Sequence, residues 1–137
     1  MRLPVRHFEK GSLKSYCGAA HAVAVNSATS ALHIACLALG LKPGDIVWTT
    51  PITFVASANC ALYCGATVDF VDIDPATLNL SVPALEAKLR QAQVSGCLPK
   101  ILIPVHLING PFSTKYEKAA LPKTETRPLL NVIFCRH

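Results

Sequence analysis

The chain has 137 residues, of which 51% are hydrophobic and 15% charged, and its formal net charge is +5. This length allows one small domain or part of a larger one, and the low polarity excludes an intrinsically disordered chain. The chain is also more apolar than a small free-standing domain, which keeps much of its surface in water. We therefore expect a segment that the rest of a larger chain or a partner subunit buries.

The sequence lacks the patterns of nucleic-acid-binding, secreted and membrane proteins. The excess of basic residues lies after residue 108 and is not clustered with aromatic residues, which argues against nucleic acid as a partner. Two long stretches without charged residues, 15–41 and 46–68, carry too many polar side chains for a membrane span. No apolar run follows the basic start, so we expect no signal peptide and a cytoplasmic location.

The six cysteines do not form an obvious disulfide or metal pattern. Cys36, Cys60 and Cys64 lie among alanine and leucine, so we expect them to be small buried apolar residues. Cys60 and Cys64 have a spacing that suits two metal ligands on a helix, but no second pair at metal spacing follows. We therefore expect no metal site.

The first half of the chain predicts strands that alternate with helices. His21–Val25 has the pattern of a short strand, and Asn26 and Ser27 are both good N-caps for the helix after it. Apolar residues then recur at helical spacing up to Gly40. They are Ala28, Ala31, Leu32, Ala35, Cys36 and Leu39. A turn at 42–45 leads into a second predicted strand, Ile46–Thr49.

The alternation continues beyond this strand. Pro51 opens the next predicted helix, Gly65 ends it, and Thr67–Ile73 has the β-branched composition of a third strand. Ser81 caps another predicted helix, and Ile101–Val105 is a fourth strand. In that helix the inward positions are Val82, Leu85 and Leu89, and the positions expected to face water are Glu86, Lys88 and Arg90.

This order predicts an α/β fold in which helices cover both faces of a mostly parallel sheet. Residues 1–108 carry the pattern, whereas residues 109–137 contain several prolines and lysines and no sustained period. We interpret 109–137 as a divergent tail that is frameshifted or disordered. An ordinary long loop followed by an edge strand is the alternative.

The first candidate site is the predicted strand-to-helix junction within Val23–His33. The free N–H groups and the dipole at a helix N-terminus favour an anion. Ser27, Thr29 and Ser30 add hydroxyl groups within one turn, and Ala28 leaves room for a phosphate. Helix capping without any ligand explains the same residues and is the alternative.

The second candidate is the junction Thr50–Asn59, because ligands of parallel sheets bind outside the carboxyl ends of the strands. Phe54 is suited to stack on a planar ring there, and a role in the core is the alternative. His106 ends the fourth strand at the same edge and is a further candidate, whereas mid-helix His33 is expected to be structural. Three carboxylates are expected to be polar strand ends and not catalytic groups: Asp69, Asp72 and Asp74.

Four stretches of the chain resemble the DegT/StrS-type nucleotide-sugar aminotransferases, in residues and in order: His21–His33, Gly40–Asp45, Thr50–Asn59 and Gly65–Asp74. The resemblance runs from about Phe8 to Leu107 and is strongest to the transaminases of pseudaminic acid biosynthesis. It implies part of the three-layer sandwich of the fold-type I aminotransferases, with pyridoxal phosphate as cofactor. It also implies glutamate as amino donor, a 4-keto-6-deoxy nucleotide sugar as substrate, and a homodimer as the full-length assembly.

At matching positions the resemblance implies roles for five residues. Ala28, Thr29 and Ser30 hold the cofactor phosphate, Phe54 stacks on the pyridine ring, and Asn59 supports the site. The family's lysine that binds the cofactor covalently, and the aspartate that pairs with the pyridine nitrogen, have no counterpart motif in this sequence.

These departures predict a chain truncated at both ends that carries no catalytic residue and is inactive alone. The alternatives are a non-enzymatic fragment that binds a phosphate compound or pairs with a partner, and a non-functional remnant.

Overall fold

The computed structural model describes residues 23–105, which form a three-stranded parallel sheet with flanking helices. The sheet has the order β2-β1-β3, with β1 at Ile46–Thr49, β2 at Thr67–Phe70 and β3 at Ile101–Ile103. Both neighbours run parallel to the central strand β1. The predicted α/β architecture is confirmed. The start of the predicted strand at His21, His106 and the tail 109–137 lie outside the described residues.

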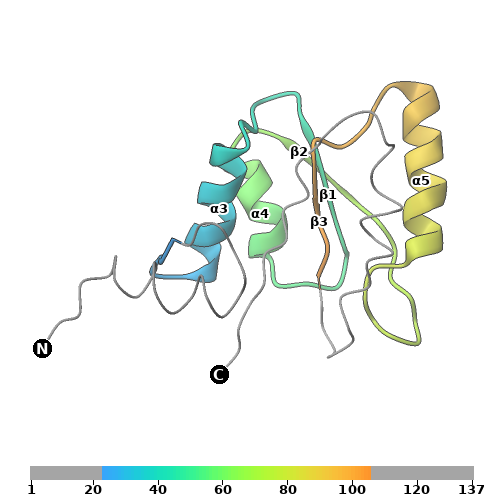
Figure 1. The fold of residues 1–137 in the computed structure, drawn as a ribbon, viewed down its shortest axis with the longest axis horizontal. Coiled ribbons are helices and arrows are strands. Elements are labelled where there is room, and N and C mark those ends of the chain that lie inside the picture. The colour runs from blue at the N-terminus through green and yellow to red at the C-terminus, as the bar shows by residue number, and fades with distance from the viewer. Residues whose placement is uncertain (1–22, 106–137) are drawn as a thin grey trace, which may run out of the picture.

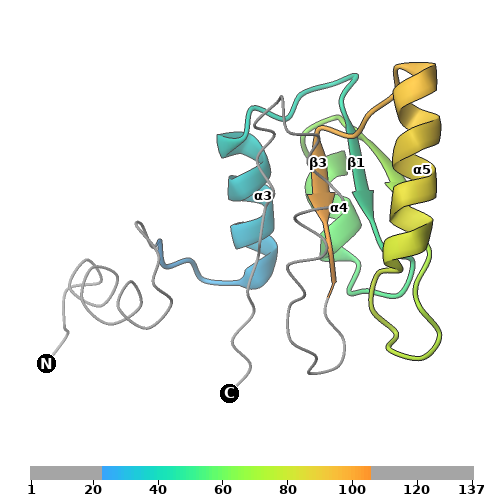
Figure 2. The same ribbon diagram turned by 45° about the vertical axis from the view of Figure 1, so that its right-hand side comes forward.

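Three helices cover the two faces of this sheet (Figures 1 and 2). Helices α3 (Ala28–Ala38) and α4 (Ala56–Leu62) lie together on one face, and α5 (Val82–Ser95) lies alone on the other. Within residues 23–105, no helix has both the length and the apolar character that a membrane crossing needs.

Successive residues of the strands supply two separate cores, because side chains alternate between the faces of a sheet. Val47, Ile101 and Ile103 pack with α3 and α4, where they meet small residues such as Cys60 and Ala61. The residues of the opposite core, under α5, are Trp48, Val71, Leu80, Leu85, Ala92 and Leu102.

Three cysteines lie in the core under α3 and α4, as the sequence predicted. Cys36, Cys60 and Cys64 are buried and carry free thiols. A hydrogen bond to Cys60, together with burial, raises the pKa of the Cys36 thiol, and burial raises the pKa of Cys64. Cys36 and Cys64 therefore remain protonated, poorly nucleophilic packing residues.

The neighbours of β1 are shorter than the sequence predicted. The strand predicted at Thr67–Ile73 ends at Phe70, and the one predicted at Ile101–Val105 ends at Ile103. The reason is common to both, because β1 ends at Thr49, which is the register partner of Phe70 and Ile103. Beyond Thr49 neither neighbour has a strand with which to pair.

Two further expectations about local structure are wrong. Val23–Val25, the described part of the strand predicted at His21–Val25, is exposed and belongs to no strand. The helix predicted from Pro51 begins at Ala56 instead. Residues 51–54 form an irregular bend, in which the Oγ1 hydroxyl of Thr50 donates to the carbonyl of Ile52 over 3.3 Å.

Helix α5 has the N-cap and the inward face that the sequence predicted, and it ends at a glycine that the sequence reasoning did not name. The Ser81 hydroxyl accepts the Ala84 N–H at its start, and Gly96 ends it in the left-handed conformation with φ 73°. Leu85 is fully buried, and Val82 and Leu89 pack against the same core.

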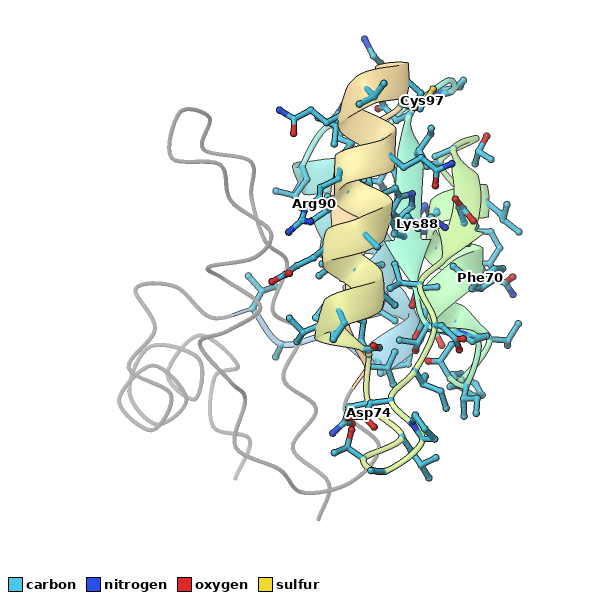
Figure 3. All side chains as sticks on the ribbon, turned by 90° about the vertical axis from the view of Figure 1, so that its right-hand side faces the viewer. Phe70, Asp74, Lys88, Arg90 and Cys97 are labelled. Carbon is cyan, nitrogen blue, oxygen red and sulfur yellow. The ribbon has the colours of Figure 1, made fainter. Side chains whose placement is uncertain are left out.

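Lys88 does not face water as expected. Its Nζ lies 2.7 Å from Oδ2 of Asp69, donates to the carbonyl of Phe70, and sits 5.0 Å from the centre of the Trp48 ring. Figure 3 shows Lys88 extending toward β2, while Arg90 points away on the other side of α5. Lys88 therefore ties α5 to the sheet through one charged group and its partners.

Candidate functional site

The carboxyl ends of the strands and the start of every described helix lie at one edge of the sheet. In Figure 1 the strands run down to this edge, and α3, α4 and α5 rise from it. The two predicted junctions, at Ser27–Ser30 and at Thr50–Asn59, both lie there. Open parallel sheets bind ligands at this edge, so the topology brings the two candidate segments to the place where a site is expected.

The N-terminus of α3 has the features of an anion site. Ser27 is the N-cap, in extended conformation, and its hydroxyl accepts the Ser30 N–H at 3.2 Å and lies 3.0 Å from the Ser30 hydroxyl. The N–H of Ala31 donates to the Ser27 carbonyl. Within the described residues the N–H groups of Ala28 and Thr29 have no acceptor, as is usual in the first turn of a helix.

The electrostatic setting of this turn favours a bound anion. The first turn of α3 carries no acidic residue, so nothing on the helix itself neutralises its positive end. Ser27 and Ala28 are exposed, and Thr29 and Ser30 are partly exposed, which leaves their N–H and hydroxyl groups accessible. A phosphate would meet backbone donors, two serine hydroxyls and the helix dipole at once.

Phe54 lies in the bend between β1 and α4 and is not a core residue. It is 73% exposed, so this ring packs in neither core of the described residues. Its carbonyl accepts the N–H of Ser57 at 3.0 Å, and this bond starts the turn that leads into α4. An exposed ring at the carboxyl edge of the sheet is available to stack on a flat ligand.

Asn59 lies one turn into α4 and is half-buried. One turn further along α4, Tyr63 makes an edge-to-face contact with His33 of α3, with ring centres 5.3 Å apart. His33 in turn lies one helical turn above Thr29. Asn59 precedes Tyr63 by one turn, as Thr29 precedes His33, so Asn59 sits at about the level of the α3 N-terminus. His33 has the structural role that the sequence predicted.

The three aspartates that follow β1 in sequence stabilise local structure. Asp69, Asp72 and Asp74 each accept a backbone N–H from a residue one or two positions later. The hydrogen bond from Lys88 lowers the pKa of Asp69 below its usual range. The interpretation of these carboxylates as polar structural groups agrees with these contacts.

The sequence reasoning did not find the buried hydroxyls around the Phe54 bend. Thr49 and Thr50 are fully buried, and Thr49 Oγ1 donates to the carbonyl of Ile103 at 3.0 Å. Thr53 Oγ1 lies 2.9 Å from the Oγ of Ser57, which is 5% exposed. The available signal was the density of hydroxyl residues on both sides of Pro51, in a stretch without charges.

Comparison with known proteins identifies the family of this chain. The model of the DegT/DnrJ/EryC1/StrS aminotransferase family matches residues 4–115. The chain belongs to this family. Its fold is part of the fold-type I aminotransferase fold, and family members depend on pyridoxal phosphate.

Individual relatives agree with this assignment. The chain is 46% identical over 100 residues to the GDP-perosamine synthase of Caulobacter vibrioides, covering 73% of this chain and 25% of that protein. It is 52% identical over 85 residues to the UDP-4-amino-4,6-dideoxy-N-acetyl-beta-L-altrosamine transaminase of Campylobacter jejuni, covering 62% and 22%. The crystal structure of a Brucella abortus aminotransferase of the same family matches with a TM-score of 0.74 and 34% identity, covering 85% and 31%.

The chain spans about a quarter of the length of the curated relatives that it matches. The described residues nevertheless fit two parts of pyridoxal phosphate. The donor-rich, acid-free turn at Ser27–Ser30 suits its phosphate, and the exposed ring of Phe54 suits its flat pyridine.

Proposed function

We propose that this chain is the N-terminal part of the cofactor domain of a pyridoxal-phosphate sugar aminotransferase. The whole enzyme would move an amino group from glutamate to a 4-keto-6-deoxy nucleotide sugar, in the cytoplasmic synthesis of a cell-surface sugar such as pseudaminic acid. The observation that supports it most is the meeting of an acid-free helix N-terminus with an exposed aromatic ring at one sheet edge. Membership of the family makes pyridoxal phosphate the ligand that we expect at that edge.

Each candidate residue has a proposed task toward the cofactor, which supplies an electron sink for amino transfer when it is bound. The N–H groups of Ala28 and Thr29 and the hydroxyls at the α3 terminus hold the phosphate. Phe54 covers one face of the pyridine ring and excludes water from it. Asn59, at the level of the α3 terminus, supports the site through its side-chain amide.

The phosphate assignment is tested by titrating the chain with pyridoxal phosphate, pyridoxal and inorganic phosphate. We expect Ser30→Ala and Thr29→Val to weaken the two phosphate compounds by roughly three- to tenfold each, as lost hydrogen bonds to a charged group do. Pyridoxal, which has no phosphate, should bind equally to all variants. Equal affinities of wild type and both variants for pyridoxal phosphate would remove the α3 terminus from the proposal.

The proposed reaction is tested in a chimera. Residues 1–108 replace the matching segment of the Campylobacter jejuni transaminase, and amino transfer to its keto-sugar is measured. Activity supports the proposed domain boundary and function, and an inactive but folded and cofactor-loaded chimera contradicts them. The chain alone, supplied with cofactor, glutamate and keto-sugar, should give no turnover, because no lysine in it lies in a motif that matches the family's catalytic lysine.

A second candidate is a non-enzymatic role in which the chain pairs with a partner, such as a copy of itself. It is favoured by the exposed apolar residues on the outer side of α3 and α4, namely Ile34, Leu37, Leu62 and Tyr63. Sedimentation of the purified chain distinguishes this role, since a stable assembly without cofactor affinity favours pairing over the enzyme proposal.

A further inference from the structure

Phe54 has an exposed ring whose position cannot come from packing. It is 73% exposed, and its neighbours Ile52 and Val55 are 48% and 58% exposed. A side chain with so few contacts is placed by its backbone, so the groups that fix residues 53–54 decide where the ring lies. Those groups lie in the bend itself and in the first turn of α4, and they are not an ordinary helix cap.

Helix α4 starts without the usual side-chain cap. Its N-cap residue is Val55, in helical conformation, and no side chain caps the first turn. Serine, threonine, aspartate or asparagine normally occupies this position and stabilises the helix start. In α4 a different contact fills this role, between a side chain two residues before the cap and one two residues after it.

Ser57 holds both residues of the bend. Its N–H donates to the carbonyl of Phe54 at 3.0 Å, and its Oγ lies 2.9 Å from Oγ1 of Thr53. Ser57 is only 5% exposed, so its hydroxyl needs this partner. One buried residue therefore fixes Thr53 through its side chain and Phe54 through its backbone.

A second buried hydroxyl fixes the other end of the bend. Thr50 is 1% exposed and its Oγ1 donates to the carbonyl of Ile52. The strand end before it is tied to β3 by the bond from Thr49 to Ile103. The bend from Pro51 to Phe54 is thus held at both ends by hydroxyls that lie inside the domain.

We propose that the Thr53–Ser57 hydroxyl pair is a positioning device that presents the ring of Phe54 to the cofactor's pyridine. The proposal rests on the proposed function, because it takes Phe54 as the stacking residue. The pair does not touch the cofactor in this assignment. It acts through the backbone of Phe54, and it replaces the missing cap of α4.

The decisive variant is Thr53→Val in the full chain, which keeps the side-chain shape and removes the hydroxyl. The affinity for pyridoxal phosphate, followed by the induced circular dichroism of the cofactor, should fall by roughly three- to tenfold, the size of one lost hydrogen bond. Inorganic phosphate, which needs only the α3 terminus, should bind as well as to wild type. Thr53→Ser keeps the hydroxyl and should restore the affinity.

A double-mutant cycle separates positioning from general loosening. In a Phe54→Ala background, Thr53→Val should cause no further loss of affinity, because the ring that it positions is gone. A loss of equal size in both backgrounds overturns the proposal. So does a Thr53→Val chain that binds pyridoxal phosphate like wild type while Phe54→Ala binds it more weakly.

A readout without ligand decides the remaining case, in which wild type binds no cofactor and the proposed function fails. Amide hydrogen exchange should then be faster at Ser57 and Ala58 in Thr53→Val than in wild type. It should stay unchanged at Val47 and Trp48 in β1. Unchanged exchange at Ser57 shows that the pair does not hold the bend, and the positioning proposal fails with it.

Discussion

The helices on the two faces of this small sheet differ in the residues beneath them and in the residues on their outer surfaces. Beneath α3 and α4 the core is made largely of alanine and cysteine together with strand side chains, and the outer surface of these helices exposes large apolar residues such as Ile34 and Leu37. Beneath α5 the core holds Trp48 and several leucines, and the outer surface carries charged groups such as Arg90. The outer surface of α5 thus suits contact with water, whereas the outer surface of α3 and α4 does not.

This difference follows from the distribution of charge along the sequence. Both α3 and α4 lie within the charge-free stretches 15–41 and 46–68, whereas α5 contains Glu86, Lys88 and Arg90. The chain spans about a quarter of its relatives, and an apolar outer layer is what a piece of a larger α/β domain is expected to carry. The high apolar content thus reflects one layer and not the whole domain.

The largest expected effects come from the two cores, which should be equally sensitive. Leu32→Ala on α3 and Leu85→Ala on α5 each remove a side chain that is at most 1% exposed. Each should lower the free energy of unfolding by about 2–5 kcal/mol, through lost burial and a new cavity. Urea denaturation measures this change. A small loss at Leu32 alone would indicate that the α3 layer is loosely packed.

Two glycines test how tightly each layer is joined to its turns. Gly65, with φ +74°, would place a Cβ 2.9 Å from Cγ of Pro43, whereas Gly96 at the end of α5, with φ +73°, faces open space. Gly65→Ala should cost about 2–4 kcal/mol, because it combines left-handed strain with a clash. Gly96→Ala should cost about 1–2 kcal/mol, from strain alone. Equal losses in thermal unfolding would show that Pro43 gives way.

Substitutions of two basic residues on α5 compare a charge that ties the helix to the sheet with a charge that faces water. Lys88→Met removes the contacts to Asp69, Phe70 and Trp48 and should cost about 1 kcal/mol, since both charged side chains are partly exposed. Arg90→Met breaks only a 3.9 Å ion pair with Glu86 at the surface and should change stability by less than about 0.5 kcal/mol. A larger loss at Arg90 would contradict this assignment.

The same contact predicts a pH dependence of stability. The pKa of Asp69 is lowered from 3.8 in the folded chain, mainly by the hydrogen bond from Lys88. The unfolded chain therefore takes up a proton at higher pH than the folded chain. The stabilisation is fully present above pH 3.8 and is lost as the pH falls through the lower folded pKa. In Lys88→Met the free energy of unfolding should fall less steeply as the pH is lowered. Part of the fall that remains should come from Asp45, whose pKa is lowered by Lys100. An unchanged slope would show that Asp69 does not contribute.

Substitutions on the outer surfaces of the helices should have the smallest effects on stability. There the two faces of the sheet should differ in how strongly they promote self-association. Leu37→Gln on α3 and Val94→Gln on α5 alter residues that are 54% and 91% exposed, and each should change stability by less than about 0.5 kcal/mol. Self-association of the chain, measured by sedimentation, should fall for Leu37→Gln and stay unchanged for Val94→Gln. The reverse result would show that the surface through which the chain associates lies on α5.

The elements that the sequence predicted well are those with local signals. Ser81 caps α5 as expected, Ser27 is the one of the two predicted cap residues, Asn26 and Ser27, that caps α3, and β1 has the predicted bounds. The ends of β2 and β3 were not predictable, because they depend on where β1 stops and so on contacts distant in sequence. Lys88 was misplaced for the same reason, since its partners lie on two strands.

The candidate site divides in the same way. Its place at the carboxyl edge and the hydroxyl-rich turn at the start of α3 could be inferred from strand-to-helix order and residue types. The exposure of Phe54 could not, because its spacing suits a core residue equally well. The contact between Thr53 and Ser57 requires a helix that begins at Ala56, and the sequence pattern had started that helix at Pro51.

The contact between Lys88 and Phe70 also affects the free edge of the sheet. The N–H of Val71, the residue after β2, donates to the carbonyl of Thr49 in β1, so the backbone groups of Phe70 point outward, as alternate residues of a strand do. The N–H of Phe70 donates to Asp69 Oδ1 at 2.7 Å, and its carbonyl accepts Lys88 Nζ. An extended chain arriving at this edge finds both groups occupied. At Phe70 this edge therefore offers no unpaired backbone group to an added strand, because two side chains that also pair with each other occupy them.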